Sequence, residues 1–403
     1  MSDSEPPLRG VRVLDLTRLL PGPLCTQHLA DLGADVVKIE DTGAGDYAPP
    51  ALRAIVNRNK RGLQLDLKQP EAADAFLLLA RDADVVVEGF RPGAMARLGL
   101  GYDAVAAVNA RIVYCSLTGY GQSGPYRDRP GHDLNYCGHA GVSDQIGTAE
   151  DTLALSNVPI ADLMGGALTA AMGILAALFD AARSGRGRHL DIAMADGALA
   201  HAVMPLATLA AHGATRRPGN DTLTGALACY ALYRTADGRY LAVGALERKF
   251  WDALCDVIAR ADLKPLHRTG DATIEARVRD ELAAIIGARP LAHWEARFAH
   301  ADCCVSPVHT LEEALADAHF RARGMVVDSV HPTLGPLTQV ACPVKMSSYE
   351  FELRRHAPRP GEHTVELLRE AGCSDASIAA WLEKGVARAS GPVHTTDAHA
   401  NVP

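Results

Sequence analysis

The chain has 403 residues, of which 48% are hydrophobic, and it carries a formal net charge of −8 at pH 7. This composition is typical of a soluble globular protein, and the length favours two or three domains. The net negative charge argues against non-specific nucleic-acid binding, which depends on a basic surface.

The cysteines and the N-terminal sequence indicate a reducing compartment. The nine cysteines are scattered and form no C-x-x-C pair, which favours small buried apolar groups over disulfides. The first ten residues are polar and lack the apolar core of a secretory leader. We therefore expect a cytoplasmic protein.

One apolar stretch, residues 163–179, contains no charged residue but lies between Asp162 and Asp180. It is at the short limit for a membrane-spanning helix, which needs about 20 apolar residues. Because it is rich in Gly, Ala and Thr, we expect a buried core helix instead.

The first third of the chain alternates short apolar runs with helical patterns. The strands are predicted at residues 12–16, 35–40, 64–67, 84–90 and 111–117, and the helices at 21–32 and 71–80. Strands of this length separated by helices predict an α/β fold with a mostly parallel, helix-covered sheet.

The later sequence is first helix-rich, over residues 157–215, with a short strand predicted at 189–193. Near residue 225 the pattern changes. Asp237-Gly238 between two alternating runs predicts a β-hairpin. Helices are predicted at 249–259, 274–286, 291–299, 362–371 and 375–384, and a turn into sheet structure at 332–338.

These changes predict the domain organisation. Residues 1–215 form the first part of a large domain, 216–324 a smaller α+β domain, and 325–385 a return segment that completes the large domain. Residues 386–403 are small and polar, which predicts a disordered tail.

The segment Gly119-Tyr-Gly121-Gln-Ser-Gly124 matches the glycine pattern of dinucleotide-binding turns, but that pattern requires a helix directly afterwards. Pro125 and Pro130 follow, so we favour a loop near an active site over a nicotinamide site. The histidines and cysteines are dispersed, so we expect no catalytic metal.

Three residues are candidates for acid–base chemistry, and each has an ordinary structural alternative. His132 follows the proline-bounded loop. It could act as a general base, or its imidazole could simply be hydrogen-bonded to a backbone group. Asp162 precedes a long helix. It could be the N-cap residue of that helix, or a functional carboxylate at a helix terminus where backbone N–H groups attract anions. Gly165 and Gly166 would let a ligand approach the backbone closely. Glu247 opens a helix, where a glutamate is favourable in any case.

Basic residues recur near the ends of the early strands, namely Lys38, Arg58, Lys60, Arg61, Arg91 and Arg97. A solvated surface would account for them. However, the carboxyl ends of parallel strands form the usual ligand crevice, where such a cluster would suit phosphate groups.

Motifs that follow one another along the chain carry a family resemblance. They are Gly-Val-Arg-Val-Leu-Asp-Leu at 10–16, Leu-Gly-Ala-Asp-Val-Val-Lys-Ile-Glu at 32–40, Asn-Arg-Asn-Lys-Arg at 57–61, Glu-Gly-Phe-Arg-Pro-Gly at 88–93, Arg-Leu-Gly-Leu-Gly at 97–101 and Gly-Tyr-Gly-Gln-Ser-Gly-Pro at 119–125. With them the chain resembles the family III CoA-transferase (CaiB/BaiF) superfamily over nearly its whole length, and within it the α-methylacyl-CoA racemases.

This resemblance implies a Rossmann-like parallel sheet in the large domain, a smaller α+β domain and an interlocked homodimer. It implies an acyl-CoA substrate and no separate cofactor, since coenzyme A is part of the thioester. The candidates for contacts with coenzyme A are Lys38, Arg61, Arg91, Arg97, Gly131 and Tyr136.

Two activities divide this family. In its transferases, an aspartate at the position of Asp162 attacks the acyl-CoA and forms covalent intermediates. In its racemases, that aspartate works with a histidine in a Gly-His-Asp motif, which Gly131-His132-Asp133 matches. Residues 243–250 resemble the racemase segment whose glutamate, here Glu247, supports the histidine.

The resemblance implies that racemase chemistry would use His132 and a protonated Asp162 on opposite faces of an enolate. A helix N-terminus lowers a carboxyl pKa, so burial has to offset that effect at Asp162. Arg248-Lys249, where Pro-Gln is frequent, and Leu163, where Phe is more common, depart from the family pattern at the acyl site. The acyl group therefore stays open among branched fatty acyl, bile-acid-like and aryl-propionyl thioesters, and CoA transfer stays the alternative activity.

Overall fold

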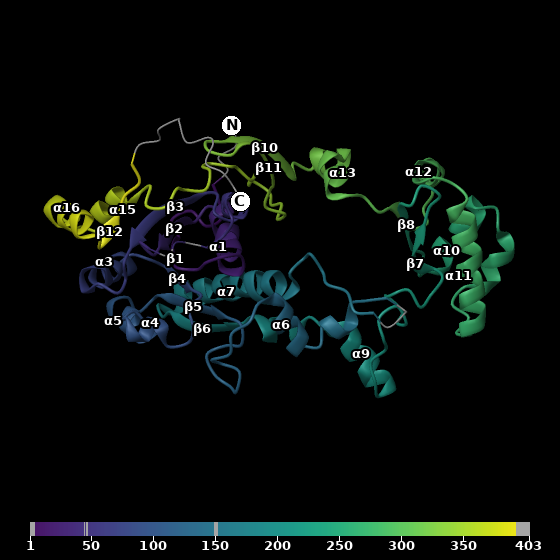
Figure 1. Cartoon of the computed structure of the whole chain (residues 1–403), viewed down its shortest axis with the longest axis horizontal. Coiled ribbons are helices and arrows are strands. Elements are labelled where there is room, and N and C mark those ends of the chain that lie inside the picture. The colour runs from purple at the N-terminus through teal and green to yellow at the C-terminus, as the bar shows by residue number, and fades with distance from the viewer. Residues whose placement is uncertain (1–4, 44, 46, 149–151, 392–403) are drawn as a thin grey trace. The chain divides into compact units, whose positions relative to one another are not determined.

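The computed structural model describes residues 5–43, 45, 47–148 and 152–391. Their contacts divide the chain into two compact units (Figure 1). Unit one comprises Met1–Ala140, Asn157–His201 and Ala322–Pro403, and unit two comprises Gly141–Ser156 and Ala202–Arg321. The longer segment of unit two thus begins at Ala202, whereas the sequence places this boundary at 216 and does not assign 141–156 to the smaller domain. Composition does not mark the observed change because the helices on both sides of it are apolar.

A seven-stranded sheet forms the centre of unit one, in the order β12-β3-β2-β1-β4-β5-β6. The strands are β1 (Arg12–Asp15), β2 (Asp35–Glu40), β3 (Lys60–Leu65), β4 (Val85–Glu88), β5 (Val113–Thr118), β6 (Arg188–Ala193) and β12 (Ala387–Arg388). The first six are parallel, and β12 pairs antiparallel with β3. The expected α/β fold with a mostly parallel sheet is confirmed.

The strand β12 corrects the prediction of a disordered tail from residue 386. Ala387 pairs with Leu65 and Arg388 with Gln64, so the start of that segment is part of the sheet. Residues 392–403 lie outside the described residues.

Helices cover the sheet of unit one (Figure 1). They are α1 (Pro21–Asp31), α2 (Pro50–Val56), α3 (Pro70–Arg81), α4 (Ala94–Arg97), α5 (Tyr102–Val108), α6 (Asp133–His139), α7 (Thr169–Ser184), α8 (Met194–Ala200), α15 (Thr364–Glu370) and α16 (Asp375–Lys384). Leu14, Val86 and Tyr114 from three neighbouring strands share one buried cluster with Phe76 of α3 and Leu367 of α15. Removing this apolar area from water is the main favourable term in folding. A hairpin, β10 (Val326–His331) and β11 (Gly335–Val340), follows the return to unit one and matches the predicted turn into sheet structure.

Unit two contains a three-stranded antiparallel sheet, β7 (Tyr230–Arg234), β8 (Tyr240–Gly244) and β9 (Val305–Pro307). The expected hairpin is confirmed by β7 and β8, with Gly238 at φ +78° in the turn. Its helices include α9 (Val203–His212), α10 (Arg248–Val257), α11 (Ala272–Gly287), α12 (Leu291–Phe298) and α13 (Leu311–Ala316), and α14 (Ala318–Ala322) leads back to unit one.

The apolar stretch at 163–179 forms most of a continuous helix, Ala161–Ser184. Ile174 and Ala177 are buried, whereas Met172 and Phe179 are 68% and 65% exposed, so the predicted core helix is buried on one face only. Among the described residues this is the one unbroken helix long and apolar enough to cross a bilayer, and α8 with α9, bent by 54°, would be a second. Core helices of soluble proteins meet the same criteria, so these features are weak signs of a membrane span.

The helix of residues 161–184 begins with a π-helical segment, η2 (Ala161–Leu168), that crosses α8 at two glycines. A Cβ atom on Gly197 would lie 2.4 Å from the backbone of Gly165, and one on Gly165 would lie 2.4 Å from the carbonyl oxygen of Met194. Gly165 and Gly166, expected to admit a ligand, serve helix packing instead, since a Cβ on Gly166 would meet Met194 and Pro21.

This close crossing makes Gly197 sensitive to one methyl group. We expect Gly197→Ala to lower the free energy of unfolding by about 1–3 kcal/mol, because backbone rather than a flexible side chain opposes the new Cβ. Urea unfolding measures the change, with Gly173→Ala as the control, since its Cβ would have only ordinary contacts of 3.5 Å or more.

Candidate active site

A cavity of about 1250 Å³ opens in unit one at the carboxyl ends of three neighbouring strands. Thr17 follows β1, Gly89 follows β4, and Thr118 ends β5, and all three line the cavity. Ligands of open parallel sheets bind at this edge. The start of α1, the start of α6 and η2 supply further lining residues, among them Pro21, His132 and Asp162.

The charges of this cavity are mostly positive. Arg18, Arg91, Arg127 and Arg129 line it, and Asp162 is the one carboxylate among the described lining residues. Arginine binds phosphate oxygens through paired N–H groups, so this wall suits a ligand with several phosphates.

Asp162 lies inside the first turn of η2 and not at the N-cap, which is Ile160. The N-cap interpretation is therefore wrong. The N–H of Asp162 donates to the Asp133 carboxylate of α6, at 3.0 Å, so a carboxylate 29 residues away satisfies this helix terminus. The Asp162 carboxylate therefore does not cap this helix terminus, and it lines the cavity instead. π-Helical segments are frequent at functional sites.

The pKa of Asp162 is raised from 3.8 to about 6. Burial is the main cause and the Asp133 charge adds to it, whereas His132 opposes the rise. The required offset against the helix terminus is thus present. A carboxyl with this pKa exchanges protons readily near neutral pH, as general acid–base catalysis requires.

We expect Asp133→Asn to lower the pKa of Asp162, because the substitution removes the like charge. If the protonated form of Asp162 is the active one, the basic limb of the activity profile moves to lower pH. A pH titration of activity measures the shift. Asp128→Asn, an exposed residue of the preceding loop, is the control and should leave the profile unchanged.

The raised pKa also affects stability. The unfolded carboxyl titrates near 3.8 and the folded one near 6, so folding is penalised progressively above pH 3.8 and fully above pH 6. We expect Asp162→Asn to raise the free energy of unfolding by about 1–3 kcal/mol at pH 8 and by less at pH 5. Urea melts at the two pH values test the sign, and a gain that is larger at pH 5 would contradict it.

His132 is the N-cap residue of α6 and its side chain is exposed to the cavity. Its backbone N–H donates to Asn135 Oδ1 at 3.0 Å, which fixes the start of the helix. The hydroxyl of buried Tyr136 donates to the carbonyl of Gly131. Cβ atoms on Gly119 or Gly131 would come within 2.4 and 2.6 Å of the Tyr136 ring, so both glycines make room for it. Gly131, His132, Tyr136 and Asp162 are thus brought together.

The other predicted site residues have different positions. Lys38 is fully buried, and its ammonium group donates to the carbonyl of Thr17. Arg61 lies at the start of β3, where it pairs with Asp35, Glu366 and Glu370 at 2.6–2.8 Å. Neither lines the cavity, and their contact with coenzyme A stays a prediction.

Arg91 lines the cavity, and Arg97 lies beside Gly93, as does Arg127. Glu247 belongs to unit two, where it is the exposed N-cap residue of α10. Its support of His132 stays a prediction. Within the described residues no three His, Cys, Asp or Glu side chains are grouped as metal ligands.

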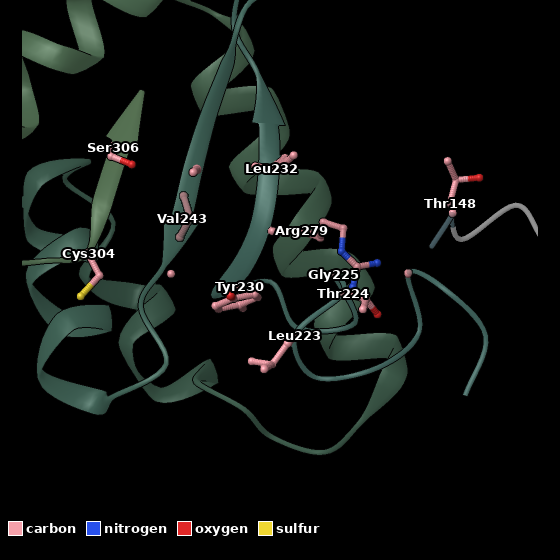
Figure 2. Close-up of a pocket in the computed structure, with 15 residues that line it drawn as sticks. Thr148, Leu223, Thr224, Gly225, Tyr230, Leu232, Val243, Arg279, Cys304 and Ser306 are labelled. Carbon is pink, nitrogen blue, oxygen red and sulfur yellow. The ribbon is translucent and has the colours of Figure 1, made fainter. Parts of the chain in front are cut away.

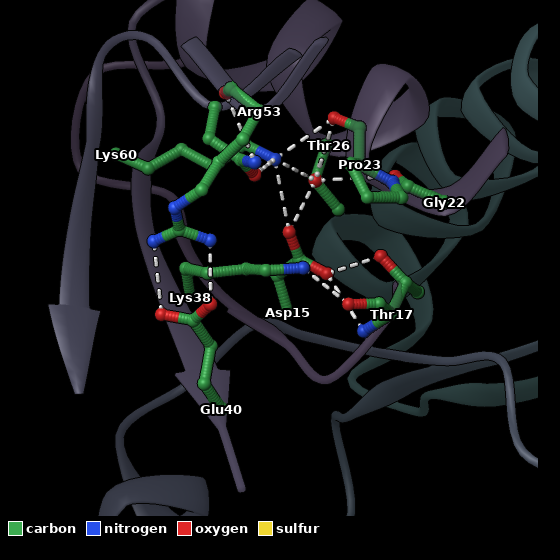
Figure 3. Close-up of polar contacts among 10 residues, drawn as sticks. Asp15, Thr17, Gly22, Pro23, Thr26, Lys38, Glu40, Arg53 and Lys60 are labelled. Atoms are coloured by element: carbon green, nitrogen blue, oxygen red, sulfur yellow. Dashed lines mark hydrogen bonds and ion pairs between the residues drawn. The ribbon is translucent and has the colours of Figure 1, made fainter. Parts of the chain in front are cut away.

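A buried polar network centred on Asp15, which no local sequence pattern indicates, adjoins the cavity at Thr17 (Figure 3). Asp15 accepts hydrogen bonds from Lys60 at 3.0 Å, from Thr26 at 2.6 Å and from the Thr17 backbone N–H at 2.9 Å. Burial alone would raise the pKa of Asp15, but Lys38, Lys60 and the two threonine hydroxyls hold it at about 2. The network anchors Thr17, the first residue of the cavity loop.

Comparison with known proteins agrees with this architecture. The sequence model of CoA-transferase family III matches residues 8–364. The chain is 36% identical to the α-methylacyl-CoA racemase of Homo sapiens over 375 residues, covering 92% of this chain and 95% of that protein. It is 32% identical to the succinyl-CoA:glutarate CoA-transferase of Mus musculus over 385 residues, covering 91% and 87%.

A solved structure is also similar, that of a CaiB/BaiF family protein from Brucella suis. It has a TM-score of 0.79 at 28% identity and covers 91% of this chain and 99% of its own. The parallel sheet with its cavity and these matches define an enzyme of the CoA-transferase/racemase superfamily. The chain belongs to CoA-transferase family III.

Proposed function

We propose that the protein epimerises 2-methylacyl-CoA thioesters by 1,1-proton transfer. The observation that carries the proposal is that His132 and Asp162 line the same cavity and that the Asp162 pKa is about 6. At pH 7 roughly a tenth of such a carboxyl is protonated, so both protonation states are available.

In this mechanism neutral His132 removes the α-proton on one face of the substrate. Protonated Asp162 delivers a proton to the opposite face, and the roles reverse for the other epimer. Each acid–base contact contributes about 10²–10⁴-fold to the rate. Glu247 would orient the imidazole and stabilise its charged form. The four arginines of the cavity would hold the phosphates of coenzyme A.

The second candidate is CoA transfer between carboxylic acids through a covalent Asp162 intermediate. It is favoured by the carboxylate of Asp162 in the cavity and by relatives of both activities at similar identity. Here the Asp162 carboxylate would attack the thioester carbonyl, release the thiolate of coenzyme A and form a mixed anhydride. The thiolate would then attack the aspartyl carbonyl, which releases the donor acid and leaves an aspartyl thioester. The acceptor carboxylate would displace the thiolate from that thioester to form a second anhydride, and the thiolate would attack its new acyl carbon, which releases the product thioester and restores Asp162.

The deciding experiment incubates one epimer of a 2-methylacyl-CoA in D₂O without any acceptor acid. Epimerisation with uptake of α-deuterium supports the racemase. Retention of configuration, together with CoA transfer once a second carboxylic acid is added, supports the transferase and rejects the first proposal. A panel of branched, bile-acid-like and aryl-propionyl thioesters then identifies the acyl group.

The proposal includes a cytoplasmic homodimer with interlocked chains and no resident cofactor, because coenzyme A enters as part of the substrate. All nine cysteines are free, which suits a reducing compartment. Large exposed apolar side chains suit a partner subunit, among them Met172, Phe179, Leu199, Met204 and Leu206. Light scattering after gel filtration should give twice the mass of the chain.

A further inference from the structure

Unit two contains a cavity of its own, of about 620 Å³ (Figure 2). Its walls come from β7, β8 and β9, from the turn before β7, and from α11. Tyr230, Leu232 and Val243 make much of the wall apolar. This volume lies within the range of about 300–1,000 Å³ in which proteins bind small organic molecules.

One charged side chain, Arg279 of α11, is found among the described residues that line this cavity. Its Nη2 donates to the Ala226 carbonyl at 2.5 Å, but its Nε is buried and has no hydrogen-bond partner. Over the described parts of the chain, no carboxylate lies within ion-pair distance of it. By contrast, Arg277 on the same helix lies 3.8 Å from Glu281.

Burying the N–H group of a charged guanidinium without a hydrogen-bond acceptor costs free energy. An anionic oxygen that accepts this hydrogen bond would remove that cost. A carboxylate matches a guanidinium because two oxygens face two parallel N–H groups. The phosphate groups of coenzyme A carry several negative charges, and a single arginine in the cavity wall would neutralise them poorly. The apolar walls require an apolar body behind the anionic group.

We propose that this cavity binds an organic monocarboxylate with an apolar body, and that Arg279 is its charge partner. The site goes beyond the thioester chemistry proposed above, because a thioester has no free carboxylate at the acyl carbon. Its test is independent of turnover, so the failure of one proposal leaves the other standing.

Cys304 provides a reporter for occupancy, because it lines the cavity and is the one exposed cysteine of the nine. Decanoate is the probe, and mass spectrometry of peptides follows alkylation by N-ethylmaleimide in the full chain. We expect decanoate to slow alkylation of Cys304 in a saturable manner without affecting half-buried Cys373 in unit one. Decanol, which lacks the charge, should protect much less. Absence of protection by decanoate, or equal protection by decanol, would overturn the proposal.

The matched variants are Arg279→Gln and Arg277→Gln. We expect Arg279→Gln to raise the decanoate concentration for half-maximal protection by about tenfold or more, and Arg277→Gln to leave it unchanged. Equal protection in both variants would reject the role of Arg279. If Arg279→Gln unfolds unit two, buried Cys255 becomes reactive without ligand, and Arg279→Lys decides instead. Weakened protection in the lysine variant, which keeps the charge but loses the paired N–H groups, supports the site, and unchanged protection overturns it.

Discussion

Replacing His132 by alanine should slow epimerisation by about 10²–10⁴-fold, because the reaction loses one of its two proton-transfer groups. The loss should depend on the substrate epimer. Deuterium uptake should vanish for the epimer whose α-hydrogen faces His132, whereas Asp162 can still exchange the proton of the other. The KM should change little, since the cavity arginines that would hold coenzyme A are untouched.

Measurement of α-deuterium in each epimer by NMR tests this expectation, and added imidazole should restore part of the lost exchange. His300→Ala is the matched control, because His300 is exposed and follows α12 in unit two. Equal loss of exchange for both epimers, or retention of most epimerisation, would contradict the two-base mechanism. Asp162→Asn removes activity in both candidate reactions, so it does not separate them.

Much of the fold could be predicted because the first strands are short, apolar and separated by helices. The sequence predicts β3 only from residue 64, whereas the strand begins at Lys60, because charged residues usually indicate a surface. Lys60 and Arg61 are buried there since Asp15, Asp35 and Glu370 neutralise them. These partners come from distant parts of the chain, so no local pattern shows them.

Part of the candidate site could be singled out from the sequence, but its electrostatics could not. The Gly-His-Asp motif and the position of Asp162 could be recognised, whereas their common cavity requires the sheet to bring α6 and η2 together. Asp133 follows His132 in the motif, yet its contact with the Asp162 backbone and its effect on the Asp162 pKa are tertiary features. The positions of Lys38 and Arg61 away from the cavity also depend on tertiary structure, so the sequence pattern does not show them.

The buried network at Asp15 should give a large stability effect. We expect Asp15→Asn to lower the free energy of unfolding by about 3–5 kcal/mol at pH 7, because fully buried Lys60 loses its ion pair with Asp15 and buried Lys38 loses a neighbouring negative charge. Asp180→Asn is the matched control. Its partner Arg188 lies at 2.7 Å, but the side chains are 38% and 62% exposed, so the loss should be below about 1 kcal/mol.

The stabilisation by the Asp15 carboxylate should depend on pH in a predictable direction. The folded pKa of Asp15 is about 2, below its ordinary value of 3.8, so its charge stabilises the fold above pH 3.8. That contribution, roughly 2–3 kcal/mol from the shift alone, is lost as the pH falls toward 2. Urea melts should therefore show the wild-type and Asp15→Asn stabilities converging below pH 4. A difference that stays constant would mean that lost packing, and not the buried charge, accounts for the effect.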